Sequence, residues 1–214
     1  MGDTLLLDID RAAVADLVGR LVADLSRRRP PHGMPYRHVN GFTKIVAAQY
    51  PDGRRLTLHY WPAAPGTAEH VSRPHDHRFP FSSVLLGGRQ RFVELAERPG
   101  AGWRRFTYRP YFGGLLARVD RQIGNIGLAE MRTVAREPLR GTYATNSTVV
   151  HQALTARREA CATLVLRGPR ERRSSRVYYR PAEPAPRGGL QFGRRLDADE
   201  VIRQLNDVLG MLSC

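Results

Sequence analysis

Cysteine is scarce in this chain, and no run of apolar residues is long enough to span a membrane. The two cysteines, Cys161 and Cys214, cannot build a disulfide framework or a Cys-x-x-Cys zinc site. The first eight residues, Met-Gly-Asp-Thr-Leu-Leu-Leu-Asp, include acidic residues and no basic region, unlike a signal or transit peptide. These absences predict a cytoplasmic protein with no membrane partner.

Lysine is nearly absent as well, since Lys44 is the only one among 34 basic residues in a chain of net charge +14. The bias toward arginine, together with plentiful alanine, glycine and proline, fits a GC-rich coding sequence as well as a selected basic surface. The charge is therefore weak evidence for a nucleic-acid partner. The sequence also lacks the interleaved aromatic and basic residues that single-strand binders use. We predict a small anionic substrate and no nucleic acid.

Length and periodicity predict one domain, 1–214, with a helix near each end. Apolar residues recur at three- and four-residue spacing from Asp8 to Arg28, which predicts an amphipathic helix within an N-terminal extension, 1–41. Asp197 is placed to cap a second amphipathic helix within 169–214, a segment of loop and C-terminal helix. Each helix is expected to cover either the barrel or the interface of a homodimer.

The middle of the chain, 42–168, reads as a barrel core of short strands without helical patterns between them. This pattern favours an all-β fold, a sandwich or jelly-roll barrel, over a parallel α/β sheet. Pro51-Asp52-Gly53 predicts a hairpin, and Pro99-Gly100-Ala101-Gly102 predicts another turn. The predicted strands include Phe42–Tyr50, Arg54–Trp61, Arg89–Ala96, Trp103–Arg109, Leu128–Val134 and Cys161–Leu166.

The stretch from Arg73 to Gly88 contains a His-x-His pair that leads into an apolar strand. Side chains alternate along an extended chain, so His75 and His77 are expected to share one side while Asp76 points away. Neutral imidazole is the commonest metal ligand, and two of them need only one or two more ligands. His151 is the predicted third ligand, and His59 is the alternative.

This layout resembles the two signature motifs of the cupin superfamily: a Pro-His-x-His loop, a strand ending in Gly87-Gly88, then short strands and a lone histidine. The glutamate of the first cupin motif is missing, because Ser82 or Phe81 stands at its position. Asn146-Ser147 stands where the second motif has Pro-x-Gly. The resemblance implies a jelly-roll barrel with a three-histidine site, the ligand set that thiol dioxygenases use. A triad completed by Glu94 is the alternative.

A site of three neutral histidines predicts Fe(II) as cofactor, with zinc, nickel or manganese as alternatives. We expect an iron oxygenase, with a small carboxylate-bearing metabolite and dioxygen as substrates. Tyr60, Arg78 and Tyr143 are its candidate catalytic residues, because a guanidinium suits a carboxylate and a phenol can hydrogen-bond. Two other classes stay open: a non-oxidative metal enzyme such as an isomerase, cyclase or decarboxylase, and a cupin-like binding protein without turnover.

Overall fold

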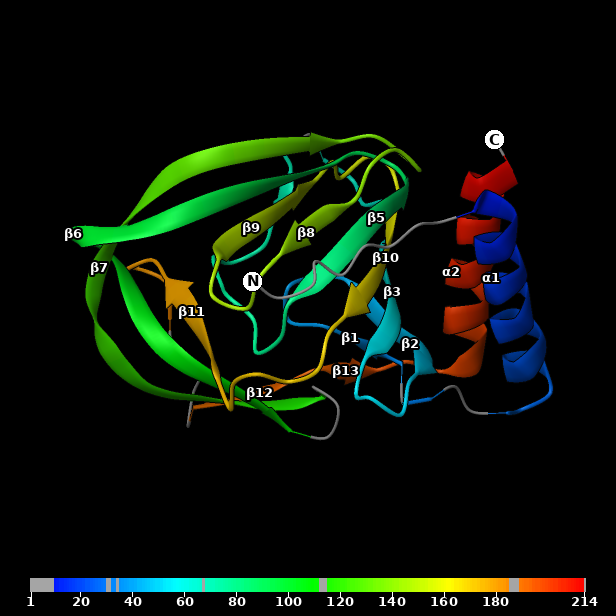
Figure 1. The fold of residues 1–214 in the computed structure, drawn as a ribbon, viewed down its shortest axis with the longest axis horizontal. Coiled ribbons are helices and arrows are strands. Elements are labelled where there is room, and N and C mark those ends of the chain that lie inside the picture. The colour runs from blue at the N-terminus through cyan, green and yellow to red at the C-terminus, as the bar shows by residue number, and fades with distance from the viewer. Residues whose placement is uncertain are drawn as a thin grey trace.

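The computed structural model describes residues 10–29, 32–33, 35–66, 68–111, 115–184 and 189–213. Two antiparallel sheets face each other, and two helices pack on the outer side of one of them (Figure 1). The helices are α1 (Arg11–Ser26) and α2 (Ala198–Ser213). The strands are β1 (Tyr36–Arg37), β2 (Thr43–Gln49), β3 (Arg55–Trp61), β4 (His70–Val71), β5 (Phe81–Gly87), β6 (Gln90–Tyr111), β7 (Leu116–Arg136), β8 (Tyr143–Thr145), β9 (Val150–Thr155), β10 (Cys161–Arg167), β11 (Ser175–Tyr179), β12 (Leu190–Phe192) and β13 (Arg194–Arg195).

The first sheet has the strand order β13-β1-β2-β3-β10-β5-β8 in the described residues. Strands β2 and β3 form the predicted hairpin, in which Lys44 lies opposite His59 and Thr43 opposite Tyr60. Because side chains alternate along each strand, His59 and Lys44 face the second sheet, whereas Tyr60 faces the helices. One face of this sheet therefore lies toward the second sheet, and the other packs against the helices.

The second sheet has the order β12-β7-β6-β9-β4, and β11 also pairs with β6. Strands β6 and β7 form a long curved hairpin, the wide green arch in Figure 1. The predicted turn at Pro99–Gly102 is wrong: these residues form a bulge inside β6, between Arg98 and Trp103. Here Gly100 serves close strand packing, since a Cβ on it would lie 3.2 Å from the Cα of Gly127 on β7. At the far end of this hairpin Tyr111 lies opposite Leu116.

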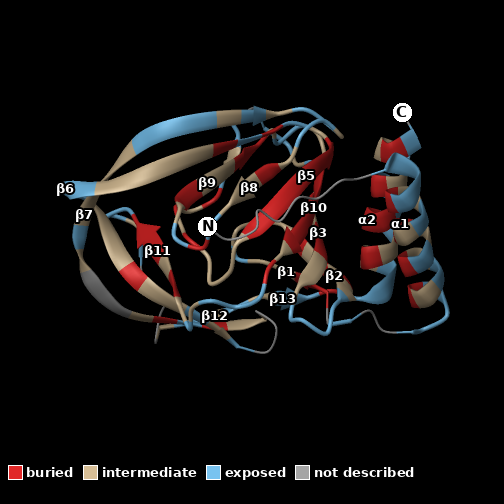
Figure 2. Cartoon of the chain, viewed as in Figure 1, coloured by how far each residue is buried: buried red, intermediate tan, exposed pale blue. Residues whose placement is uncertain are grey.

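The main hydrophobic core lies between the two helices and the outer face of the first sheet, where buried residues face one another (Figure 2). It includes Val14, Val18, Leu21, Leu25, Ile45, Leu58, Leu86, Leu164, Val201, Leu205, Val208 and Leu212. Burying a side chain of this size stabilises the fold by about 1.5 to 3 kcal/mol relative to exposing it. This core holds the first sheet in place without using its inner face.

Both helix starts are capped by an aspartate. Asp10 accepts a hydrogen bond from the Ala12 amide at 3.1 Å, and Asp197 accepts one from the Glu200 amide at 2.7 Å. Within the described residues, neither helix is long and apolar enough to cross a membrane.

The predicted all-β fold with a helix near each end is confirmed. Strands β11, β12 and β13 add pairings that come from 169–214, so both sheets extend beyond Gly168. The first nine residues of the predicted N-terminal extension, the Pro30-Pro31 helix stop and Cys214 lie outside the described residues.

Candidate metal centre

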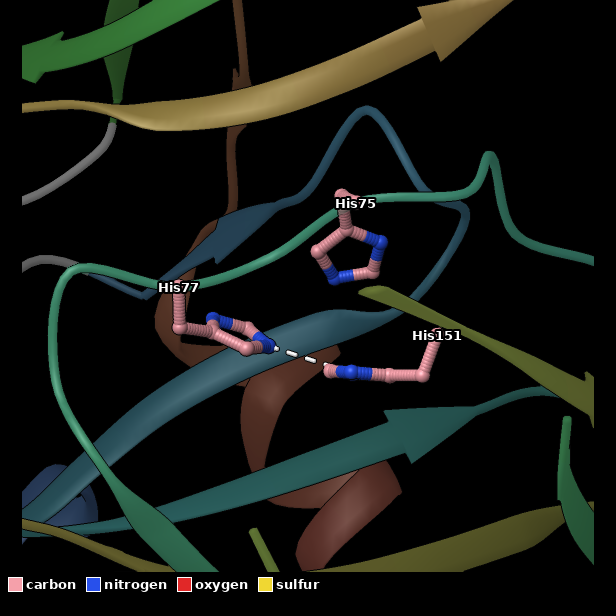
Figure 3. Close-up of side chains that lie close together, drawn as sticks. All are labelled: His75, His77 and His151. Carbon is pink, nitrogen blue, oxygen red and sulfur yellow. Dashed lines mark hydrogen bonds between the residues drawn. The ribbon is translucent and has the colours of Figure 1, made fainter. Parts of the chain in front are cut away.

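Three histidines converge between the two sheets: His75 and His77 from the loop between β4 and β5, and His151 from β9 (Figure 3). Their ligand nitrogens all lie within 4.8 Å of one another. His75 and His151 form an antiparallel bridge, in which each amide donates to the other residue's carbonyl, at 3.1 and 2.9 Å. The backbone itself therefore brings the two predicted motifs together.

Hydrogen bonds to carbonyl oxygens orient two of the three rings. Nδ1 of His75 donates to the Arg73 carbonyl at 2.8 Å, and Nδ1 of His151 donates to the Val149 carbonyl at 3.2 Å. Each ring therefore leaves Nε2 as its ligand atom, because the partner of one nitrogen sets the role of the other. Nε2 of His77 lies 3.3 Å from Nε2 of His151. That separation is short enough for one metal ion to bind both nitrogens.

The three imidazoles are held in the neutral form that binds metal. Burial is the main cause that lowers the pKa of each ring. The pKa of His151 falls to about 3, to which His75 contributes, and the pKa of His77 falls well below its usual value, with His75 and His151 contributing. Ring geometry and protonation state thus both fit a divalent metal ion.

Asp76, between the two loop histidines, ties this loop to β11. Its side chain is fully buried. It accepts hydrogen bonds from Arg172 Nη1 at 2.7 Å, Arg176 Nε at 2.6 Å and the Arg176 amide at 2.5 Å. Charge-assisted bonds of this kind are among the stronger ones in proteins. The carboxylate thus fixes the segment that carries both loop histidines.

No carboxylate joins the histidine group within the described residues. Glu94 lies opposite His151 in the sheet, but its oxygens accept hydrogen bonds from Arg132 at 2.6 Å and from the Tyr143 hydroxyl at 3.0 Å. Phe81, one of the two residues that could stand at the position of the missing glutamate, places its ring 4.8 Å from that of His77. The neutral donor set is that of a three-histidine site.

The histidines line a cavity of about 390 Å³ between the sheets. Aromatic and cationic side chains dominate its walls. The aromatic ones are Tyr36, Phe42, Trp61, Phe79, Phe81, Phe92, Tyr108 and Tyr111, and the cationic ones are Lys44, Arg55, Arg73, Arg78, Arg167, Arg170 and Arg176. Such a cavity suits a small ligand with an apolar body and a negative group.

The three predicted catalytic residues lie in different places. Arg78 lines the cavity. Tyr143 lies behind the cavity wall, stacked on Phe92 at 4.1 Å, with its hydroxyl on Glu94. The prediction of Tyr60 as a catalytic residue is wrong. Tyr60 packs in the core under the helices, and its hydroxyl donates a hydrogen bond to Asp207 of α2 at 2.5 Å. Strand alternation explains this, because Tyr60 shares the face of Leu58.

Lys44, Arg167 and His38 are cavity residues that the sequence did not indicate. His38 stacks on Phe42 at 4.6 Å, and Phe42 stacks on His59 at 4.4 Å, all within the cavity wall. The alternation of β2 and β3 was the available signal, since it places Lys44 and His59 on one face. His59 lines the cavity but does not belong to the three-histidine group.

No protein-family model and no curated sequence matches the chain. Similar solved structures include the DMSP lyase DddQ from Ruegeria pomeroyi DSS-3 (12% identity, 59% of this chain and 46% of that chain, TM-score 0.34). Others are a cupin domain from Bordetella pertussis Tohama I (11%, 60% and 93%, TM-score 0.29) and the hydroquinone 1,2-dioxygenase PnpCD (11%, 78% and 80%, TM-score 0.37). The chain spans about half the length of the DMSP lyases that it matches. At these TM-scores the likeness assigns no activity to the chain.

Proposed function

We propose that this protein is a mononuclear metal-dependent enzyme, an Fe(II) oxygenase that acts on a small carboxylate-bearing metabolite. The observation that carries this proposal is the convergence of three neutral imidazoles on the wall of a cavity of about 390 Å³, with no carboxylate among the described residues joining them. Three neutral ligands leave the ion its full positive charge, and imidazole suits iron, zinc and nickel. Zinc, nickel or manganese in a non-oxidative enzyme is the alternative.

Each part of the cavity has its own role in this proposal. His75, His77 and His151 would hold the ion, and Fe(II) when bound would supply open coordination positions where substrate and dioxygen can meet. Phe79, Phe81 and Phe92 exclude water around the reacting atoms and position an apolar substrate body. Holding reactants in one orientation removes much of the entropic part of a barrier.

Metal analysis of anaerobically purified protein tests the proposal. The expected result is one Fe(II) per chain and substrate-dependent oxygen uptake with a panel of small carboxylates. His77→Ala should remove both, whereas His32→Ala, at an exposed position outside the cavity, should keep both. One bound zinc, nickel or manganese ion with turnover but no oxygen uptake would favour the non-oxidative enzyme. Absence of any bound metal and of any turnover would contradict the enzyme proposal and favour a binding protein.

A further inference from the structure

Four cationic side chains gather at one end of the cavity: Lys44 on β2, Arg55 on β3, Arg78 after the histidine loop and Arg167 on β10. We call these four residues the cationic cluster. Within the described part of the chain, none of them forms an ion pair with a carboxylate. Arginines elsewhere do, for instance Arg54 with Asp52 at 2.6 Å. The cluster therefore concentrates positive charge that the described protein does not neutralise.

In the first sheet two members of the cationic cluster are direct neighbours. Arg55 and Arg167 lie directly opposite each other on neighbouring strands, and both line the cavity. Side chains at such positions are about 5 Å apart at Cβ, and like charges there destabilise a sheet. Burial, then Arg167, Arg55 and Arg78, lower the pKa of Lys44 to about 8. A fold that tolerates this repulsion fits a site that a negative ligand neutralises.

Arg167 also keeps an unused donor. Its Nε is buried and has no hydrogen-bond acceptor among the described residues. A buried donor without an acceptor is costly, and such groups in a native protein often mark a ligand site. The only acidic residue among the described lining residues is Asp76, which Arg172 and Arg176 already occupy. An acceptor for Arg167 is therefore expected from outside the protein.

The space between the cationic cluster and the histidines is bounded by aromatic rings. The Arg167 guanidinium lies 4.6 Å from the ring centre of Phe79, whose ring lies 5.4 Å from that of His77. Added together, these separations place the guanidinium at most 10 Å from the His77 ring centre. A ligand no longer than one substituted aromatic ring can therefore reach from the cationic cluster to the histidines, beside Phe79.

We propose that the cationic cluster is the carboxylate subsite of this cavity, and that the substrate is an aromatic carboxylate whose ring points its far end at the histidines. The carboxylate would receive the unused donor of Arg167 and lie between Lys44 and Arg55. This inference deepens the proposed function and rests on it only in taking the histidine end as the reacting end.

Binding of 4-fluorobenzoate, followed by ¹⁹F NMR in metal-free and in zinc-loaded protein, tests this subsite without turnover. Lys44→Gln and Arg55→Gln should each weaken binding about tenfold or more, because each removes a charged partner. Arg89→Gln, which removes an equal charge from an exposed site, should bind like the wild type. The uncharged 4-fluorobenzamide should bind much more weakly than the benzoate.

The thermal midpoint of unfolding provides a second measurement. If Lys44 and Arg55 only stabilised the fold, replacing either of them would lower this midpoint. Without any anion present, Lys44→Gln and Arg55→Gln should raise the thermal midpoint, by about 2 to 4 °C, because repulsion is relieved. Equal benzoate binding by all variants, or benzamide binding as tight as benzoate, would overturn the subsite. Tighter binding of inorganic phosphate would overturn the choice of a carboxylate. Failure of the metal proposal would show separately, as benzoate binding by a protein that takes up no metal.

Discussion

Replacing Asp76 by asparagine should loosen the loop that presents two of the three histidines. The change keeps the shape of the side chain but removes the charge that holds Arg172 and Arg176. Both arginines come much later in the sequence: Arg172 precedes β11, and Arg176 lies within it. The carboxylate therefore joins the histidine loop to a strand that is distant in sequence. The two arginines would keep their own charges and lose their shared counterion.

The expected magnitude follows from the burial of the three groups. Breaking a buried ion pair by removing one partner costs about 3 to 5 kcal/mol. The arginine side chains are 31% and 26% exposed and can partly turn to water, so the lower end applies, about 3 kcal/mol of unfolding free energy. For a chain of this size that loss lowers the thermal midpoint by about 6 to 12 °C. Metal affinity should fall about 10- to 100-fold, as when a group that orients ligands is lost.

The assay combines thermal unfolding with competition against a chromogenic chelator. Asp76→Asn should still take up one metal ion at saturation, because Asp76 is not a ligand. Asp52→Asn is the matched control: it alters an exposed aspartate that also pairs with an arginine, and it should leave both measurements unchanged. Wild-type stability and wild-type metal affinity in Asp76→Asn would refute the reasoning.

Three further predictions concern other residues of the site and the core. His151→Ala should weaken metal binding more than about 100-fold, since a direct ligand counts for more than an orienting group. His59→Ala should retain the metal, and the reverse result would make His59 the third ligand in place of His151. Tyr60→Phe should lower the unfolding free energy by about 1 kcal/mol through the lost bond to Asp207, with unchanged metal affinity; weaker metal binding would return Tyr60 to the site. Benzoate binding should weaken as the pH rises through about 8, where Lys44 loses its charge, and Lys44→Gln should remove this dependence; a wild-type pH profile in that variant would assign the titration elsewhere.

Local pattern was enough to predict much of the fold and the histidine group. Alternation placed His75 and His77 together, and the caps at Asp10 and Asp197 mark helices that the spacing of apolar residues had indicated. Alternation also places Tyr60 on the face of Leu58, but it does not say which face of β3 lines the cavity, and the packing of the helices decides that.

What the sequence did not predict depends on contacts between distant segments. Arg55 and Arg167 meet only because β3 and β10 are neighbours, a pairing across more than a hundred residues. The glycines at Pro99–Gly102 suggested a reversal, because a glycine that permits a turn and one that permits close strand packing look alike in sequence. Tertiary pairing decides between the two.

The long hairpin of β6 and β7 also bears on the order in which the chain folds. Its strands meet across the short connection between Tyr111 and Leu116, so little chain entropy is lost when they begin to pair. His75 and His151 are 76 positions apart, and their bridge must close a far larger loop. We therefore expect the hairpin to form early and the histidine group to assemble among the last contacts. A metal ion would then meet its three ligands together only in a chain that has largely folded, and would trap the native state rather than guide the chain toward it.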